Sequence, residues 1–183
     1  MNRQILVVML IALLVVIMLF FNKKVNLIRL FIEQLKVFKN ARTGKQSIWD
    51  LICFFVFPIA ISGLIVFGLS FRVTAQLAET LTTVFSLVFT ILFGFAAVIV
   101  ERRERDTEKK KRVVSETFVS IITSTSLSLF AAFISILLTI ITKDLYVSIL
   151  SIILFAVSLH IIMLLLMIIK RTFVIYCEGE REK

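Results

Sequence analysis

Long apolar runs alternate with short charged blocks along the 183 residues of the chain. A run of seventeen or more apolar residues is long enough for a helix to cross a hydrocarbon core about 30 Å thick. The first run is expected to remain as a span, because Leu19, Phe20 and Phe21 stand where a signal peptide would carry small residues. The pattern therefore predicts an all-α integral membrane protein with about five transmembrane helices, at residues 5–21, 51–71, 80–100, 117–142 and 145–169.

The segment between the first two spans is basic and has a helical pattern. Apolar residues such as Ile28, Phe31 and Leu35 recur every three or four positions, while Arg29 and Lys36 fall on the opposite side. A basic amphipathic helix of this kind is expected either to lie in the inner membrane interface or to pack on the other spans.

The segment between the third and fourth spans is densely charged, and its acid and base residues lie four apart. Glu101 precedes Arg105 and Asp106 precedes Lys110 at this spacing, which stabilises an exposed helix. The third span is therefore expected to project into the cytoplasm as a helical connector. Ser115 is a candidate N-cap for the fourth span.

The distribution of Lys and Arg predicts the orientation. Eighteen of the 21 Lys and Arg residues follow the first, third or fifth span, and only Arg3, Arg72 and Lys143 fall on the other side. By the positive-inside rule, the N-terminus is outside, the C-terminus is inside, and the protein is expected in the plasma (inner) membrane. The predicted order is a first transmembrane helix (1–21), a cytoplasmic amphipathic helix (22–50), a transmembrane hairpin (51–100), a cytoplasmic connector (101–116), a second hairpin (117–169) and a cytoplasmic tail (170–183).

Composition and charge agree with this picture. Hydrophobic residues make up 60% of the chain, and the net charge of +9 is confined to the segments between spans. The expected partner of those segments is the anionic inner leaflet, and no nucleic acid is expected because no loop is long enough to form a basic binding face. Cys53 and Cys177 are expected to be reduced thiols.

Catalysis is not expected, because the sequence has no metal-ligand cluster, nucleophile motif, phosphate-binding loop or intramembrane carboxylate pair. No cofactor is expected either. His160 is the single ionisable residue inside a predicted span, and it serves either a proton relay or, as a neutral imidazole, a hydrogen bond to a hydroxyl of a neighbouring helix. Pro58 is predicted to bend the second span, with Ser62 and Gly63 accommodating the bend, and the alternatives are a gating hinge and a static kink.

Two rows of small and hydroxylated residues are the sharpest functional signal. One follows the third span at Ser86, Thr90 and Gly94, and the other follows the fourth span. Such rows typically pack helices together, and here they are expected to face each other. In a symmetric oligomer the fourth-span row could instead line a hydrated path. The fourth-span candidates are Ser120, Ser124, Ser128, Ser135 and Thr139.

These features predict a non-enzymatic, self-associating membrane subunit that serves as an anchor, sensor or effector for a cytosolic partner. In a bacterium this role would suit stress or phage defence, by analogy of architecture alone. The alternative is an oligomeric ion channel or membrane-permeabilising pore lined by the fourth helix. The candidate contacts with partner or lipid are Lys23, Lys24, Arg29, Lys36, Arg102, Arg103 and Arg105.

Overall fold

A computed structural model describes residues 27–38, 47–103, 108–141 and 143–181, together with Leu10, Leu14 and Ile17. These residues form helices joined by short loops, with no strand among them. The elements are α2 (Leu27–Val37), α3 (Ile48–Leu51), the π-helix η1 (Ile52–Val56), α4 (Phe57–Gly63), the π-helix η2 (Leu64–Gly68), α5 (Ala75–Arg103), α6 (Glu108–Ile140) and α7 (Asp144–Arg181).

Four helices of the described part of the chain are long and apolar enough to cross a membrane, which makes this a multi-pass membrane protein. The first of them comprises α3, η1, α4 and η2 without interruption and is called the 48–68 helix below. The predicted first span lies outside the described residues, apart from its Leu10, Leu14 and Ile17. The four candidate spans are Ile48–Gly68, Ala75–Glu101, Lys111–Ile140 and Asp144–Val174.

Two predicted helix starts are corrected. The external turn ends earlier than expected, because α5 begins at Ala75 and Thr74 Oγ1 accepts a hydrogen bond from the Leu77 N–H at 3.3 Å. Ser115 is not an N-cap, because α6 already begins at Glu108. The charged residues that precede Ser115 are good helix formers, so the helix continues through them.

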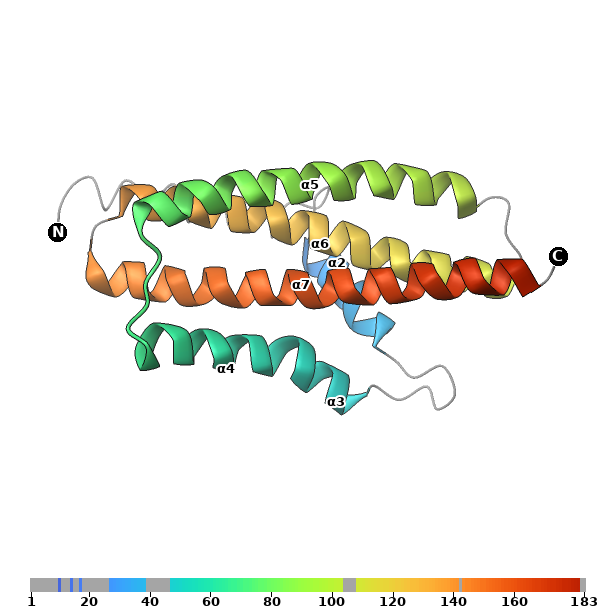
Figure 1. Cartoon of the computed structure of the whole chain (residues 1–183), viewed down its shortest axis with the longest axis horizontal. Helices are drawn as coiled ribbons and strands as arrows, with labels where there is room; N and C mark the ends of the chain where they lie inside the picture. The colour runs from blue at the N-terminus through green and yellow to red at the C-terminus, as the bar shows by residue number, and fades with distance from the viewer. Residues whose placement is uncertain are drawn as a thin grey trace.

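The helices α5, α6 and α7 run lengthwise side by side, and the 48–68 helix packs against α7 (Figure 1). Helix α6 is the centre of the bundle because α5, α7 and α2 all contact it. Within an apolar stretch of 18 residues in its candidate span, 61% is buried inside the structure, whereas the corresponding stretches of the other three spans are 17 to 28% buried. The fourth predicted span is therefore enclosed by the chain itself.

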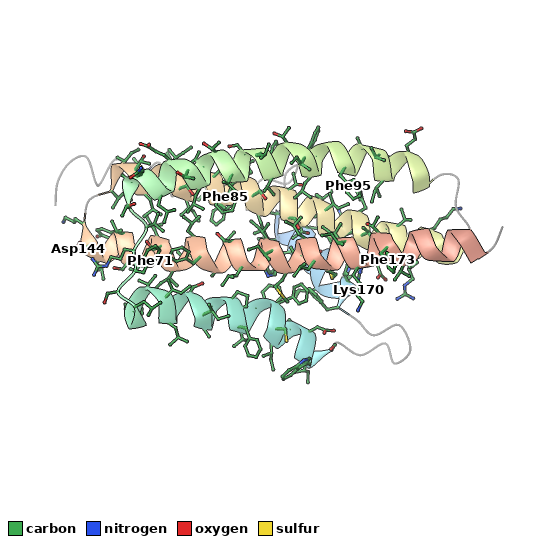
Figure 2. The ribbon with its side chains drawn as sticks, viewed as in Figure 1. Phe71, Phe85, Phe95, Asp144, Lys170 and Phe173 are labelled. Carbon is green, nitrogen blue, oxygen red and sulfur yellow. The ribbon has the colours of Figure 1, made fainter. Side chains whose placement is uncertain are left out.

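The packing faces of α5 and α6 follow a seven-residue spacing. On α5 the buried residues Phe85, Leu92 and Ile99 are seven apart, and on α6 Ile121 and Ser128 continue the same spacing. This repeat is typical of helices that cross at about +20°, as in most membrane bundles. Phe85 lies between α5 and the helices below it in Figure 2.

The two ends of the bundle differ in chemistry. At the end where α6 turns into α7, called the turn end, Arg72 Nη1 donates to Asp144 Oδ1 at 3.0 Å. The N–H of Val73 donates to Ser151 Oγ at 3.1 Å, so the loop before α5 is tied to α7 (Figure 2). At the opposite end, called the connector end, α5 finishes and α6 begins.

Candidate functional site

The hydroxyl row of the predicted fourth span lies inside the bundle. Ser120, Ser124, Ser128 and Ser135 are fully buried, and they are called the α6 row. Each hydroxyl donates to the carbonyl four residues earlier in the same helix, at 2.8 to 3.0 Å. Thr139 continues the row but is exposed, and its hydroxyl donates to the Ile136 carbonyl. The buried donors are thus satisfied within α6, and the small side chains let neighbouring helices approach.

The row of the predicted third span lies on the outer surface of the bundle, unlike the buried α6 row. Ser86, Thr90 and Gly94 are exposed and are called the α5 row. A Cβ added at Gly94 would meet no heavy atom within 4 Å. The two rows therefore do not face each other, which corrects the expectation from the sequence. Helix α5 packs on α6 through its larger residues, including Phe85 and Leu92.

His160 joins α7 to the 48–68 helix at the proline. Pro58 is buried, lies in the first turn of α4 and has no N–H, so the carbonyl of Phe54 lacks its α-helical donor. His160 Nδ1 lies 2.7 Å from that carbonyl oxygen. Because a carbonyl only accepts, Nδ1 must carry the proton in this bond. The partner of His160 is thus a backbone carbonyl and not the hydroxyl expected from the sequence.

Ser62 is bonded to its own helix one turn after the proline. Its hydroxyl donates to the carbonyl of Pro58 at 2.6 Å, and the side chain is fully buried. Ser62 therefore does not satisfy the carbonyl that Pro58 leaves free. The π-helices η1 and η2 flank α4, so the hydrogen-bonding register changes on both sides of the proline.

Helix α2 packs along the connector half of α6 and is held to the 48–68 helix by aromatic rings. The ring centroids of Phe31 and Phe55 are 5.5 Å apart, and those of Phe38, directly after α2, and Phe54 are 4.7 Å apart. The side chain of Gln34, also on α2, is fully buried, and neither its oxygen nor its nitrogen has a hydrogen-bond partner among the described residues. The same holds for His160 Nε2.

A cleft of about 510 Å³ lies toward the connector end, between the end of α2, the start of the 48–68 helix and the part of α7 from Met163 to Val174. Its charged lining residues are Lys170 and Arg171 of α7 and Asp50 of the 48–68 helix. Arg171 Nη2 lies 3.4 Å from Glu116 Oε2, and Glu116 Oε1 accepts from Arg112 Nε at 3.0 Å. The cleft thus combines a basic end with apolar walls, and it is called the connector cleft.

The predicted contact residues are only partly placed. Arg29 is exposed on α2, and Lys36 Nζ donates to Glu33 Oε1 at 2.7 Å. This hydrogen bond lowers the pKa of the exposed Glu33 carboxyl below its usual range. Lys23, Lys24 and Arg105 lie outside the described residues, while Arg102 and Arg103 belong to the last turn of α5.

Comparison of the chain with protein-family models, curated proteins and solved structures gave no match. Among the described residues, no group of three or more His, Cys, Asp or Glu side chains is arranged to hold a metal ion. The arrangement offers helix contacts and an amphipathic cleft for binding. Sequence reasoning missed Phe54 and Arg171, although the position of Phe54 four residues before the single proline was a usable signal.

Proposed function

We propose that the chain is a non-enzymatic membrane subunit that associates with copies of itself through the α5 row and anchors a cytosolic partner at its connector end. The observation that carries the proposal is the exposure of Ser86, Thr90 and Gly94 on a helix whose other face is packed. We do not propose the alternative of a pore lined by α6, because its row from Ser120 to Ser135 presents no open face to a second subunit.

The α5 row has the composition of a helix-pairing face. Small residues four apart let two helix backbones approach closely in lipid, where apolar contact alone gives no preference for protein over lipid. Thr90 Oγ1 and Ser86 Oγ are bonded to their own helix at 2.9 and 2.8 Å, so exposing them to lipid leaves no donor unsatisfied. The exposed neighbours Leu87 and Ile91 would pack beside the row of a second copy.

The proposed orientation places the connector end in the cytoplasm, with five spans including residues 5–21 and an outside N-terminus. The support is the distribution of Lys and Arg along the sequence, since all but three of them follow the first, third or fifth predicted span. Helix α7 continues beyond its candidate span, from Val174 to Arg181, and α6 begins at Glu108, before its span starts at Lys111. These helical extensions are where a cytosolic protein would bind.

Self-association is tested with Gly94→Leu, which fills the row, and Phe93→Leu, which changes a neighbouring exposed side chain outside it. Native mass spectrometry of the detergent-solubilised protein gives the number of chains. We expect an oligomer for the unmodified protein and for Phe93→Leu, and monomers for Gly94→Leu. A monomer at every protein concentration in the unmodified chain would remove the proposal, and an unchanged Gly94→Leu oligomer would place the interface elsewhere.

The cytosolic partner is tested by reversing the charge at Arg102, Arg103 and Arg105. We expect a protein that copurifies with the unmodified chain to be lost from this variant. The matched control reverses Arg72 at the turn end, which should leave copurification intact. Purification of the unmodified chain alone, after mild solubilisation, would contradict the anchor role.

A further inference from the structure

We propose that the connector cleft is a binding site for one anionic phospholipid, with the phosphate at Lys170 and Arg171 and an acyl chain along α7. This inference goes beyond self-association and partner anchoring. It rests only on the membrane location of the helices, and its test is read out on single chains. The lipid site can therefore be disproved without affecting the proposed function, and the proposed function can be disproved without affecting the lipid site.

The wall of the cleft on α7 is apolar and continuous with the lipid-facing surface. Met163, Leu166 and Met167 lie within about 10 Å of helix below Lys170, given a rise of 1.5 Å per residue. Leu166 is 57% exposed, so the wall continues onto the outer face of α7, where acyl chains lie. Methionine side chains adapt to irregular apolar partners, and Phe54 forms the opposite wall.

The basic end of the cleft lies where the apolar run of α7 stops. Lys170 is the first charged residue after the uncharged run 145–169, which places it at the level of lipid headgroups. Across the cleft, Asp50 follows Trp49, which is 67% exposed and stands at the start of the 48–68 helix. Tryptophan is enriched at this depth of the bilayer. Lys170 is on the side of α7 nearer the 48–68 helix in Figure 2.

Arg171 supplies the feature that points to an anionic ligand. Its side chain is only 19% exposed, and its Nη2 is 3.4 Å from Glu116. Its Nη1 is buried and has no hydrogen-bond partner among the described residues. An unsatisfied guanidinium donor is unfavourable, and a phosphate matches its paired N–H groups. Because Arg171 lines the cleft, a change in the flexible torsions of its aliphatic stem would turn the planar guanidinium, and with it Nη1, toward a ligand there.

The charge around the cleft also favours an anion. The charged residues that line the cleft are Lys170 and Arg171 against one carboxylate, Asp50. Glu116, the partner of Arg171, is shared with Arg112. Basic pockets between transmembrane helices recognise lipid headgroups in this way. A free phosphate would use the basic end alone, whereas a phospholipid also uses the apolar wall that leads to the bilayer.

The experiment titrates delipidated protein in detergent with phosphatidylglycerol or phosphatidylcholine of the same acyl chains, and native mass spectrometry counts the bound lipids on each chain. We expect phosphatidylglycerol to bind more tightly, and Lys170→Gln with Arg171→Gln to lower its affinity by about 30-fold. Lys143→Gln, an exposed cation at the turn end, should leave the affinity unchanged. Equal binding of the two lipids to the unmodified protein would overturn the proposal.

Two further variants separate binding from a structural role of the ion pair. Glu116→Gln removes the carboxylate partner of Arg171 but keeps Lys170 and Arg171, so phosphatidylglycerol should bind at least as well. A loss as large as that of the double variant would mean that the pair acts only on the fold, and the proposal would be wrong. Met167→Trp keeps every charge and fills the apolar wall, so it should weaken lipid binding even if the double variant fails to fold.

Inorganic phosphate and glycerol 3-phosphate provide the last arm of the test. A lipid site predicts that neither competes with phosphatidylglycerol at millimolar concentration, because neither contacts Met163 and Leu166. Full competition by inorganic phosphate would show a phosphate site without a lipid, against the proposal.

Discussion

The α5 row and the α6 row share a sequence pattern and have opposite environments. Both place small or hydroxylated residues four apart, and in both the hydroxyls bond to carbonyls of their own helix. Yet Thr90 and Gly94 are exposed, whereas Ser124 and Ser128 are fully buried. The four-residue spacing therefore predicts a surface that can pack closely, and it does not say what packs there.

The spacing of the larger residues and the number of neighbouring helices together set the environment of each row. On α6, Ser128 and Ser135 continue the seven-residue spacing of Val114 and Ile121, so they share the buried face. On α5, the buried positions at this spacing include Phe85 and Leu92, and Ser86 directly follows one of them. Ser120 is fully buried although it directly precedes Ile121, because α6 is contacted by α5, α7 and α2, whereas among the described elements α5 packs on α6.

The largest expected effect comes from filling the α6 row. Ser124→Leu with Ser128→Leu adds volume where no space exists, and each change should cost about 1–3 kcal/mol of unfolding free energy. The matched pair Ser86→Leu with Thr90→Leu should stay within about 0.5 kcal/mol, because both positions are exposed. The measurement is loss of helical circular dichroism in mixed detergent micelles as the fraction of SDS rises. Equal losses for both pairs would mean that the two rows do not differ in environment.

The second-largest effect is expected from removing a hydrogen bond between two helices, in contrast to the hydroxyl bonds made within α6. His160→Leu leaves the Phe54 carbonyl without its donor and should cost about 1–3 kcal/mol in the same assay. Pro58→Ala restores a backbone N–H, so in that background the cost of His160→Leu should fall. Identical costs in the two backgrounds would show that the proline does not create the need for the histidine.

Cross-linking distinguishes the rows without changing stability. In a chain with Cys53 and Cys177 replaced by alanine, Thr90→Cys should form disulfide-linked dimers on mild oxidation in membranes. Ser124→Cys should stay monomeric, because its side chain is enclosed by its own chain. Non-reducing electrophoresis gives the yields. Dimers from Ser124→Cys alone would reverse the assignment of the two faces.

The smallest expected effect is Ser128→Ala. The hydroxyl is bonded to the Ser124 carbonyl of its own helix, so its removal breaks no contact between helices. The loss should be below the roughly 0.6 kcal/mol that is typical of hydrogen bonds between membrane helices. A loss of 2 kcal/mol or more in the micelle assay, about the size expected for His160→Leu, would show that the hydroxyl bridges α6 to a neighbour.

The positions of the helices could be predicted well from the sequence, but the contacts between them could not. The length of an apolar run can be read from the sequence alone. Each predicted span therefore corresponds to a helix that begins or ends within a few residues of the predicted bound, and the larger differences are at the connector end. The predicted spans are 51–71, 80–100, 117–142 and 145–169. The start of α6 was placed too late, because the charged residues before Ser115 were assigned to a separate connector.

The candidate site depended on contacts between distant residues. His160 and Phe54 are 106 positions apart, so their hydrogen bond required knowing that α7 lies against the 48–68 helix. The same is true of Arg171 and Glu116. The sequence indicated that His160 needs a hydrogen-bond partner. The expected partner was a hydroxyl, and the observed partner is the Phe54 carbonyl, which Pro58 leaves without its α-helical donor.

The central place of α6 bears on how the protein enters the membrane. Of the four candidate spans, α6 has the lowest mean hydropathy and the largest buried share. It is therefore the span that lipid solvates least well and that most needs protein around it. The ribosome makes α5 before α6, and only four residues separate Arg103 from Glu108. A hairpin of α5 and α6 thus enters the bilayer with part of its cover already present, and α7 completes that cover when it follows.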